Sequence, residues 1–272
     1  MNTAALYARA ALPLVPGASL LPFVAGRGDE MPDIERAREA VRPDAAHVEA
    51  YRRVCGFAAG DALPATYPHV LAFPLHLEVM TDGRFPFGAV GLVHVANRIT
   101  AHRAIGADEP LNLRVHATAI EPHPRGRAFS LVTEARAGDE LVWEERSTML
   151  RRGGGSGACD ADAGPPPPDG DEEWELAGDL GRRYASVSGD RNPIHLHPLS
   201  ARVFGFPRAI AHGMWTKARC LAALEPPDAF TVEVAFRKPI LLPARVRFGA
   251  EGERFAVRTG QDALHLTGTV TR

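Results

Sequence analysis

A segment rich in glycine and proline near the middle of the chain constrains the fold most. Residues 153–170 read GGGSGACDADAGPPPPDG, with six glycines, four prolines and almost no apolar side chain to bury. This composition is typical of a linker that is flexible at its glycine end and stiffer through its prolines. We therefore predict a unit at 1–152, a linker at 153–170 and a second unit at 171–272. A long surface loop inside one domain is the alternative.

The two units resemble each other. Each contains a tyrosine, then three residues, then a small thiol or hydroxyl residue and a glycine. These segments are Tyr51–Gly56 and Tyr184–Gly189. Each then has an apolar stretch, 67–80 or 211–224, of which the first is expected to be helical after Pro74. Period-two alternation follows, which predicts half-buried antiparallel strands. The expected strands are 89–100, 111–120, 128–136 and 140–150 in the first unit and 230–236, 245–251, 254–259 and 263–271 in the second. The fold class is α+β, with a duplicated unit in which strands wrap one long helix.

Composition excludes several classes of function. The chain has 272 residues, of which 45% are hydrophobic and 24% charged, and its formal net charge is −2. These values are ordinary for a globular protein and give no basic field for nucleic acid. Three widely spaced cysteines, with no CxxC pair, indicate neither a disulfide framework nor a zinc site, and favour a cytoplasmic location. No apolar run is long enough for a membrane span. Prolines interrupt the apolar segment Met1–Gly26, so we do not expect a signal peptide there.

The stretch Tyr184–Met214 is the most informative for local structure. A short helix is expected from an N-cap at Asp179 to the stop at Ser188–Gly189. Pro193 disfavours helix at the residue before it, so 190–195 is expected to be a loop. Pro198 opens another short helix through Val203. A longer helix begins near His212–Gly213, and places Met214, Ala218 and Leu221 on one face.

This arrangement brings together groups that can move protons. Asp190 and His195 are five residues apart on a constrained segment, where a carboxylate and an imidazole can hold a water molecule between them. A nearby carboxylate is expected to raise the pKa of His195. Gly213 lies in the first turn of the long helix, so its N–H has no intrahelical acceptor and suits a carbonyl oxygen that becomes negative. Proton transfer next to a carbonyl group is the chemistry that this set favours.

The same stretch resembles the signature of the MaoC-like (R)-specific enoyl-CoA hydratases and 3-hydroxyacyl-thioester dehydratases. The matching positions are Tyr184, Ala185, Ser188, Gly189, Asp190, Asn192, Pro193, Ile194, His195, Pro198, Ala201, Gly205, Phe206, Ile210, Ala211, His212, Gly213 and Met214. The resemblance implies two tandem hotdog units, in each of which an antiparallel sheet wraps a central helix. It departs from the family at His197, where many members have Asp, a change that can alter local pKa values.

The resemblance also implies roles for individual residues. Asp190 and His195 become the catalytic pair, Asn192 orients the loop and the water, and the Gly213 N–H binds the thioester carbonyl. The expected substrate-binding positions are Tyr184, Ser188, Ile194, Ile210, His212 and Met214. No cofactor and no metal are implied. Arg208, Lys217, Arg237 and Lys238 are candidates to meet the phosphate of a thiol carrier.

The first unit lacks the catalytic pair. Phe57 follows Gly56 where the second unit has Asp190, and Asp61 and His69 are too far apart in sequence to substitute. We therefore expect one active site per chain, with the first unit catalytically silent and able to open a channel for the acyl chain.

The leading hypothesis is a hydro-lyase that interconverts a trans-2-enoyl thioester plus water with the (R)-3-hydroxyacyl thioester. A dehydratase acting on acyl-carrier-protein substrates is an alternative with the same chemistry. A non-catalytic module that binds acyl thioesters and a thioesterase are alternatives of other classes, because fold alone does not decide activity. The expected partner is an acyl-CoA or acyl-carrier-protein thioester. Neither nucleic acid nor a membrane is expected as a partner, and a homodimer is possible.

Overall fold

The computed structural model describes residues 28–88, 91–153, 166–170, 172–260 and 263–272. The apolar N-terminal segment Met1–Gly26 and most of the glycine-rich part of the expected linker lie outside the described residues. Among the described residues, no helix is long and apolar enough to cross a membrane.

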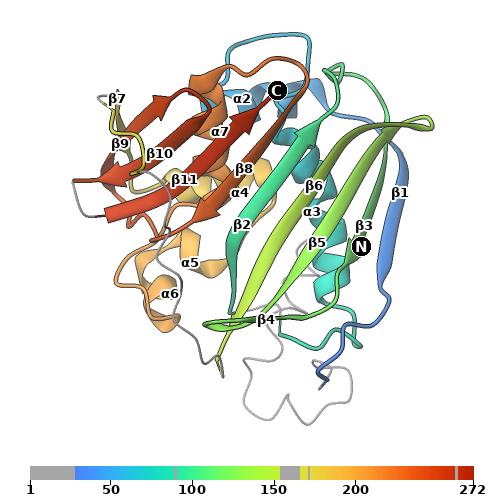
Figure 1. The fold of residues 1–272 in the computed structure, drawn as a ribbon, viewed down its shortest axis with the longest axis horizontal. Coiled ribbons are helices and arrows are strands. Elements are labelled where there is room, and N and C mark those ends of the chain that lie inside the picture. Colours follow the sequence, from blue (N-terminus) through green and yellow to red (C-terminus); the bar gives the residue numbers. More distant parts are fainter. Residues whose placement is uncertain (1–27, 89–90, 154–165, 171, 261–262) are drawn as a thin grey trace.

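All the strands join in one antiparallel sheet (Figure 1). Ten of them follow the order β1-β3-β5-β6-β2-β8-β11-β10-β9-β7, and β4 pairs with β5 at the side. The strands of the N-terminal half are β1 (Glu35–Val41), β2 (Leu92–Ala101), β3 (Leu111–Ala117), β4 (Glu121–His123), β5 (Gly126–Ala137) and β6 (Glu140–Arg152). Those of the C-terminal half are β7 (Glu172–Leu176), β8 (Phe230–Phe236), β9 (Ala244–Glu251), β10 (Arg254–Thr259) and β11 (Ala263–Thr271).

The order of the strands, followed from each edge of the sheet to its centre, is equivalent in the two halves. β1-β3-β5-β6-β2 on one side corresponds to β7-β9-β10-β11-β8 on the other. The eight strands expected from alternation are confirmed. In β8 the alternation is also one of burial, with Phe230, Val232 and Val234 buried, whereas β5 and β10 have consecutive buried residues. The edge strands β1 and β7 were not predicted.

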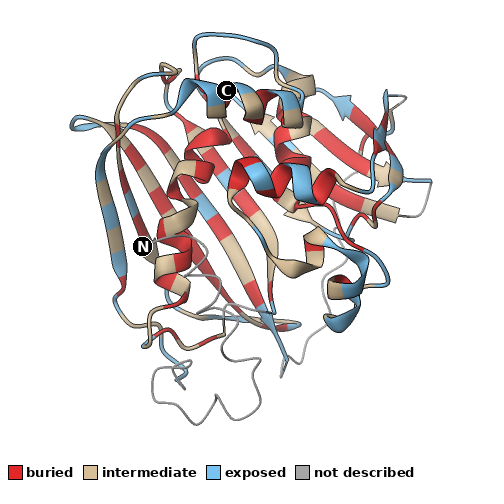
Figure 2. Ribbon diagram, turned by 180° about the vertical axis from the view of Figure 1, so that it is seen from behind, coloured by how far each residue is buried: buried red, intermediate tan, exposed pale blue. Residues whose placement is uncertain are grey.

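A long helix lies against the same face of the sheet in each half (Figures 1 and 2). These helices are α3 (Tyr67–Met80) and α7 (Gly213–Leu224). The expectation that the first is helical only after Pro74 is wrong, because the helix begins at Tyr67 and continues through this proline. Pro68 occupies the first turn, where its missing N–H costs nothing, and buried side chains on both sides of Pro74 hold the helix against the sheet.

Shorter helices precede each long one. They are α2 (Ala45–Cys55) in the first half and α4 (Leu180–Ser188), α5 (Pro193–Leu196) and α6 (Pro198–Val203) in the second. The two tyrosine-to-glycine motifs are the matching ends of α2 and α4, whose C-caps Gly56 and Gly189 have φ of 81° and 74°. Asp179 is the N-cap of α4, although its side chain makes no capping hydrogen bond.

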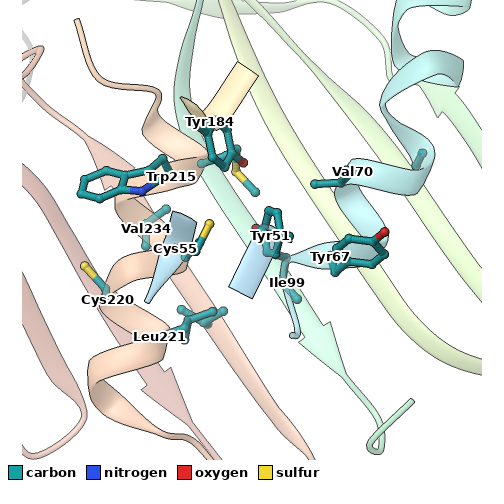
Figure 3. Close-up of a cluster of buried hydrophobic side chains, with 14 of the residues drawn as sticks. Tyr51, Cys55, Tyr67, Val70, Ile99, Tyr184, Trp215, Cys220, Leu221 and Val234 are labelled. Atoms are coloured by element: carbon teal, nitrogen blue, oxygen red, sulfur yellow. The ribbon is translucent and has the colours of Figure 1, made fainter. Parts of the chain in front are cut away.

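The two halves share one core. β2 and β8 pair in register from Ala96 opposite Ala235 to Ala101 opposite Phe230. Side chains from both halves pack together above this junction, among them Tyr51, Ile99, Tyr184 and Trp215 (Figure 3). The indole N–H of Trp215 donates to the carbonyl of Val54 at 2.9 Å and so fastens α7 to α2.

The proline end of the expected linker packs against the C-terminal half. The guanidinium of Arg254 donates to the carbonyl of Pro166 at 3.1 Å, and that of Arg258 donates to Pro167 at 2.9 Å. Residues 166–170 are therefore attached to the C-terminal half, whereas the glycine-rich part, 154–165, is outside the described residues. The division into 1–152 and 171–272 stays a prediction, since the halves share one sheet and one core.

The junction strands should carry much of the stability. Ile99 is fully buried on β2 opposite Val232 of β8, and its truncation in Ile99→Ala leaves a cavity that costs about 2–5 kcal/mol. Urea unfolding followed by circular dichroism measures the loss. Val203→Ala, at a side chain that is 80% exposed, is the control and should change stability by less than about 0.5 kcal/mol. Equal effects of both substitutions would contradict this account of the junction.

Candidate active site

The segment after α4 turns sharply and presents Asp190. Gly189 ends α4 in the left-handed conformation, and the backbone N–H of Asp190 then donates to the Ser188 hydroxyl at 3.1 Å. The Asp190 carboxylate accepts the N–H of Asn192 at 3.1 Å. These local hydrogen bonds form an Asx-type turn that fixes the direction of the carboxylate.

The expectation of an irregular loop over 190–195 is partly wrong. Pro193 opens the one-turn helix α5, because proline disfavours helix at the preceding residue but suits a first helical position. Asn192 is the N-cap, and its side chain accepts the N–H of Ile194 at 3.4 Å. Gly181 of α4 allows α5 to approach, since a Cβ at this position would lie 1.9 Å from the His195 carbonyl oxygen. The packing thus sets where His195 stands.

Asp190, His195 and His212 come together at the start of α7. One side-chain ligand atom from each lies within 4.8 Å of the others. The rings of His195 and His212 stack with their centroids 3.7 Å apart. His212 Nε2 lies 3.1 Å from the Asp190 carbonyl oxygen and 3.7 Å from its carboxylate. His212 was expected to bind substrate, with a direct catalytic role or a bond to the backbone as alternatives, and the structure shows it bonded to the Asp190 carbonyl.

Burial keeps both imidazoles neutral. It lowers the pKa of His195 and outweighs the Asp190 carboxylate and the Ile210 carbonyl, which raise it. The Asp190 carboxylate does raise this pKa, as expected, but the net shift is downward because His195 is only 9% exposed. Burial and the neighbouring His195 lower the pKa of His212 to about 3. His195 Nδ1 donates to the carbonyl of Ile210 at 2.8 Å, so Nε2 of the neutral ring is left as a proton acceptor.

Gly213 is the first residue of α7, as expected. Its N–H belongs to the first turn, where the helix offers no acceptor, at the positive end of the helix dipole. A Cβ here would lie 2.9 Å from the ring of Phe236. Glycine thus leaves room for the backbone, the aromatic ring and a ligand oxygen to meet at this point.

All the residues expected to be catalytic or to bind the substrate line one cavity. Its volume is about 380 Å³. The structure places there Asp190, Asn192, His195 and Gly213 together with Tyr184, Ser188, Ile194, Ile210, His212 and Met214. The sequence predicted that these residues would gather, and their individual roles stay predictions.

Another part of the cavity wall comes from the N-terminal half, which was expected to contribute a channel, although its lining residues were not predicted. It is formed by side chains of α3, β2, β5 and β6, namely His69, Phe73, His76, Met80, Leu92, Val93, His94, Leu131, Ser147, Met149 and Arg152. Phe73 lies 3.7 Å from the Cβ position of Gly189 and so touches the turn before Asp190. No short motif marks these residues, because they reach the site only through the pairing of β2 with β8.

Lys217 is not a phosphate ligand. Its side chain is fully buried in α7, and its ammonium donates to the backbone carbonyls of Asn97 and Val232, each at 3.3 Å, and to the Asn97 side chain. Arg237 and Lys238 do line the cavity, whereas the exposed Arg208 donates to Pro243. Cys220 of α7 is fully buried as a small apolar side chain.

The N-terminal half has no matching catalytic turn. Where Asp190 follows Gly189 in the C-terminal half, Phe57 follows Gly56. The guanidinium of Arg52 occupies the adjoining loop and donates to the carbonyls of Ala58 at 2.6 Å and Gly60 at 3.0 Å. His69, expected to be a poor substitute for a catalytic base, is hydrogen-bonded to Glu145 at 2.9 Å.

Within the part of the chain that the structure describes, two groups of side chains have spacing that suits a metal ion. They are Asp190 with His195 and His212, and His69 with His76 and Glu145. In both groups each residue already makes a hydrogen bond within the protein. These bonds account for the arrangement of both groups.

Comparison with known proteins agrees with this site. A sequence profile of the MaoC like domain matches residues 167–270, which include the whole catalytic turn and α7. Together with the whole-chain relative described next, this match shows that the chain belongs to the MaoC-like dehydratase family, and the resemblance seen in the sequence is confirmed.

The relative is 3-hydroxyacyl-thioester dehydratase X of Mycobacterium tuberculosis. It is 38% identical over 276 residues, which cover 97% of this chain and 94% of the relative. A crystal structure of that protein has a TM-score of 0.77 at 37% identity and covers 87% of this chain and 99% of its own. A MaoC-like dehydratase from Phytophthora capsici has a TM-score of 0.73 at 18% identity, with 89% and 96% of the two chains covered, and shows the same fold.

The titration of His195 should reflect its burial. We expect an NMR titration of the imidazole signals to give His195 a midpoint below 6.5, with the neutral ring present at neutral pH. Asp190→Asn should move this midpoint further down, since the Asp190 charge raises the pKa of His195. A midpoint above 6.5 in the unmodified protein would contradict this assignment of the dominant effect.

Proposed function

We propose that the chain is a hydro-lyase that interconverts a trans-2-enoyl thioester plus water with the (R)-3-hydroxyacyl thioester. The observation that carries the proposal is the convergence of Asp190, His195 and the Gly213 N–H on one cavity. The name of the relative, a 3-hydroxyacyl-thioester dehydratase, supports the same chemistry.

The geometry supports a direct path for hydration. Asp190 and His195 hold a water molecule, and the ring nitrogen of His195 that does not bind Ile210 takes up its proton as the water oxygen bonds to C3. The electrons of the C2–C3 double bond move toward the thioester, whose oxygen becomes negative and is stabilised by the Gly213 N–H. C2 then receives a proton from the same pair. Dehydration follows these steps in reverse.

We propose that the two halves are tandem hotdog units, with β2 and β8 joining them as the two subunits of a dimer would be joined. The mirrored strand order and the two long helices support this view. The N-terminal unit would be catalytically silent and would hold the acyl chain, since α3 forms part of the cavity wall. We also propose a cytoplasmic location. The two units in one chain remove the need for a partner subunit, although the chain could still form a homodimer. The free, buried Cys55 and Cys220 are compatible with a reducing compartment.

Hydration of crotonyl-CoA tests the proposal. The purified protein should remove the ultraviolet absorbance of the enoyl thioester without releasing free thiol, and Asp190→Asn should lower the rate about 100-fold or more. His102→Gln is the control, because His102 is exposed and does not line the cavity, so the rate of this variant should stay near that of the unmodified protein.

Other outcomes would identify other functions. Thiol release would indicate a thioesterase, and binding without turnover would indicate a non-catalytic module. Turnover of an enoyl group only on a carrier protein would identify the carrier-dependent dehydratase, for which Arg237 and Lys238 in the cavity wall offer positive charge. An Asp190→Asn variant as active as the unmodified protein would overturn the assigned acid–base pair.

A further inference from the structure

One face of helix α6 is apolar and exposed. Among the described residues, the large hydrophobic side chains that are mostly exposed are Leu199, at 64%, and Val203, at 80%. They are four residues apart on α6 and so lie on the same face of this helix, at the periphery of the C-terminal half (Figure 1). Single exposed apolar side chains are common on protein surfaces, but here both belong to one face of one short helix. No part of the chain that the structure describes covers this face.

Positive charge surrounds the apolar face. Arg191, Arg202 and Arg208 are exposed, and no acidic residue occurs from 191 to 224. The guanidinium of Arg202 donates to the carbonyl of Pro207 at 3.3 Å, and that of Arg208 donates to the carbonyl of Pro243 at 3.4 Å. Both acceptors are neutral, so neither charge is compensated by an ion pair with a described residue. Such a surface suits an acidic partner that also carries apolar side chains.

This surface, which we call the α6 surface (Leu199, Arg202, Val203 and Arg208), is connected to the cavity. Phe204 and Phe206, which follow α6, line the cavity. The backbone N–H of Ala211 then donates to the carbonyl of Ile240 at 2.9 Å, so the segment ends beside residues 237–239. Residues 237–239 are exposed and also line the cavity, which therefore reaches the molecular surface there. The short segment from 204 to 211 thus joins the α6 surface to this mouth of the cavity.

We propose that the α6 surface is the docking site of an acyl-carrier protein that delivers the thioester. The inference rests on the proposed function, and it selects the carrier-linked form of the substrate. An acidic helix of the carrier protein pairs with Arg202 and Arg208, while apolar side chains of that helix cover Leu199 and Val203. The arm that bears the thioester then enters the cavity beside residues 237–239.

Two other occupants fit this surface less well. Coenzyme A offers phosphates to the arginines, but phosphate groups gain nothing from the apolar face of α6. A second copy of this chain, related by a twofold axis, would bring the arginines of both copies to one interface, where like charges oppose association. A protein with a negative surface satisfies both the charges and the apolar side chains.

Hydration of one acyl group on two carriers tests the docking site. The kcat/KM of crotonyl-carrier protein, prepared with an acidic bacterial acyl-carrier protein, is divided by that of crotonyl-CoA. Arg202→Glu and Arg208→Glu should each lower this ratio about tenfold, because reversing a charge at the rim slows association with an acidic partner. Val203→Asp should lower the ratio as well, since it replaces an apolar contact by a repulsive charge.

A charge reversal elsewhere is the matched control. Arg53 of α2 is exposed and does not line the cavity, so Arg53→Glu should leave the ratio unchanged. A ratio that stays the same in the α6 variants would overturn the docking site. An equal loss with both carriers would overturn it too, and would assign the arginines to a phosphate that both carriers share.

Binding without turnover separates this inference from the proposed function. Octanoyl-carrier protein is unreactive, and its titration by calorimetry should show binding that is weakened about tenfold by Arg202→Glu. Crotonyl-CoA hydration without any binding of octanoyl-carrier protein would contradict the docking site alone. Binding of octanoyl-carrier protein without hydration of either crotonyl thioester would contradict the proposed activity alone.

Discussion

The pairing of β2 with β8 is the constraint on which the rest of the molecule depends. It joins the six strands of the N-terminal half and the five of the C-terminal half into one sheet and places α3 and α7 against the same face. Because the strands pair in a single register, the catalytic turn of one half always faces the central helix of the other. The cavity exists only as a product of this junction, since neither half supplies both of its walls.

Buried polar groups reinforce the junction from within. Lys217 of α7 donates to Asn97 of β2, and Asn97 in turn donates to Glu145 of β6. Burial lowers the pKa of Lys217 to about 7, while Glu145 is among the charges that raise it. Breaking such a buried chain at one member leaves another polar group without a partner, which costs more than the bond itself. The same carboxylate holds His69 in the cavity wall, so the interface and the site share one network.

Much of the C-terminal half could be predicted from the sequence, because its information is local. Turn residues, prolines and the start of α7 act within a few positions, and the residues of Tyr184–Met214 that were expected to be catalytic or to bind the substrate do gather at one cavity. The sign of the His195 pKa shift could not be predicted, since burial is set by the whole fold. Nor could the wall with His94 and Ser147, which becomes part of the site only through strands that are distant in sequence. Alternation predicted those strands without predicting their order.

The occupation of the N-terminal loop by Arg52 has a consequence for how such a chain evolves. In a symmetric homodimer every substitution appears in both subunits. A change that improves substrate binding in one subunit can therefore damage catalysis in the other. Here the two halves belong to one chain and differ in sequence. In the N-terminal loop the guanidinium of Arg52 binds backbone carbonyls, and no turn like that of Asp190 is present among the described residues. Each half is then free to accumulate substitutions suited to a single task. On the proposal of a silent N-terminal unit, the reacting groups and the binding wall are inherited independently of each other.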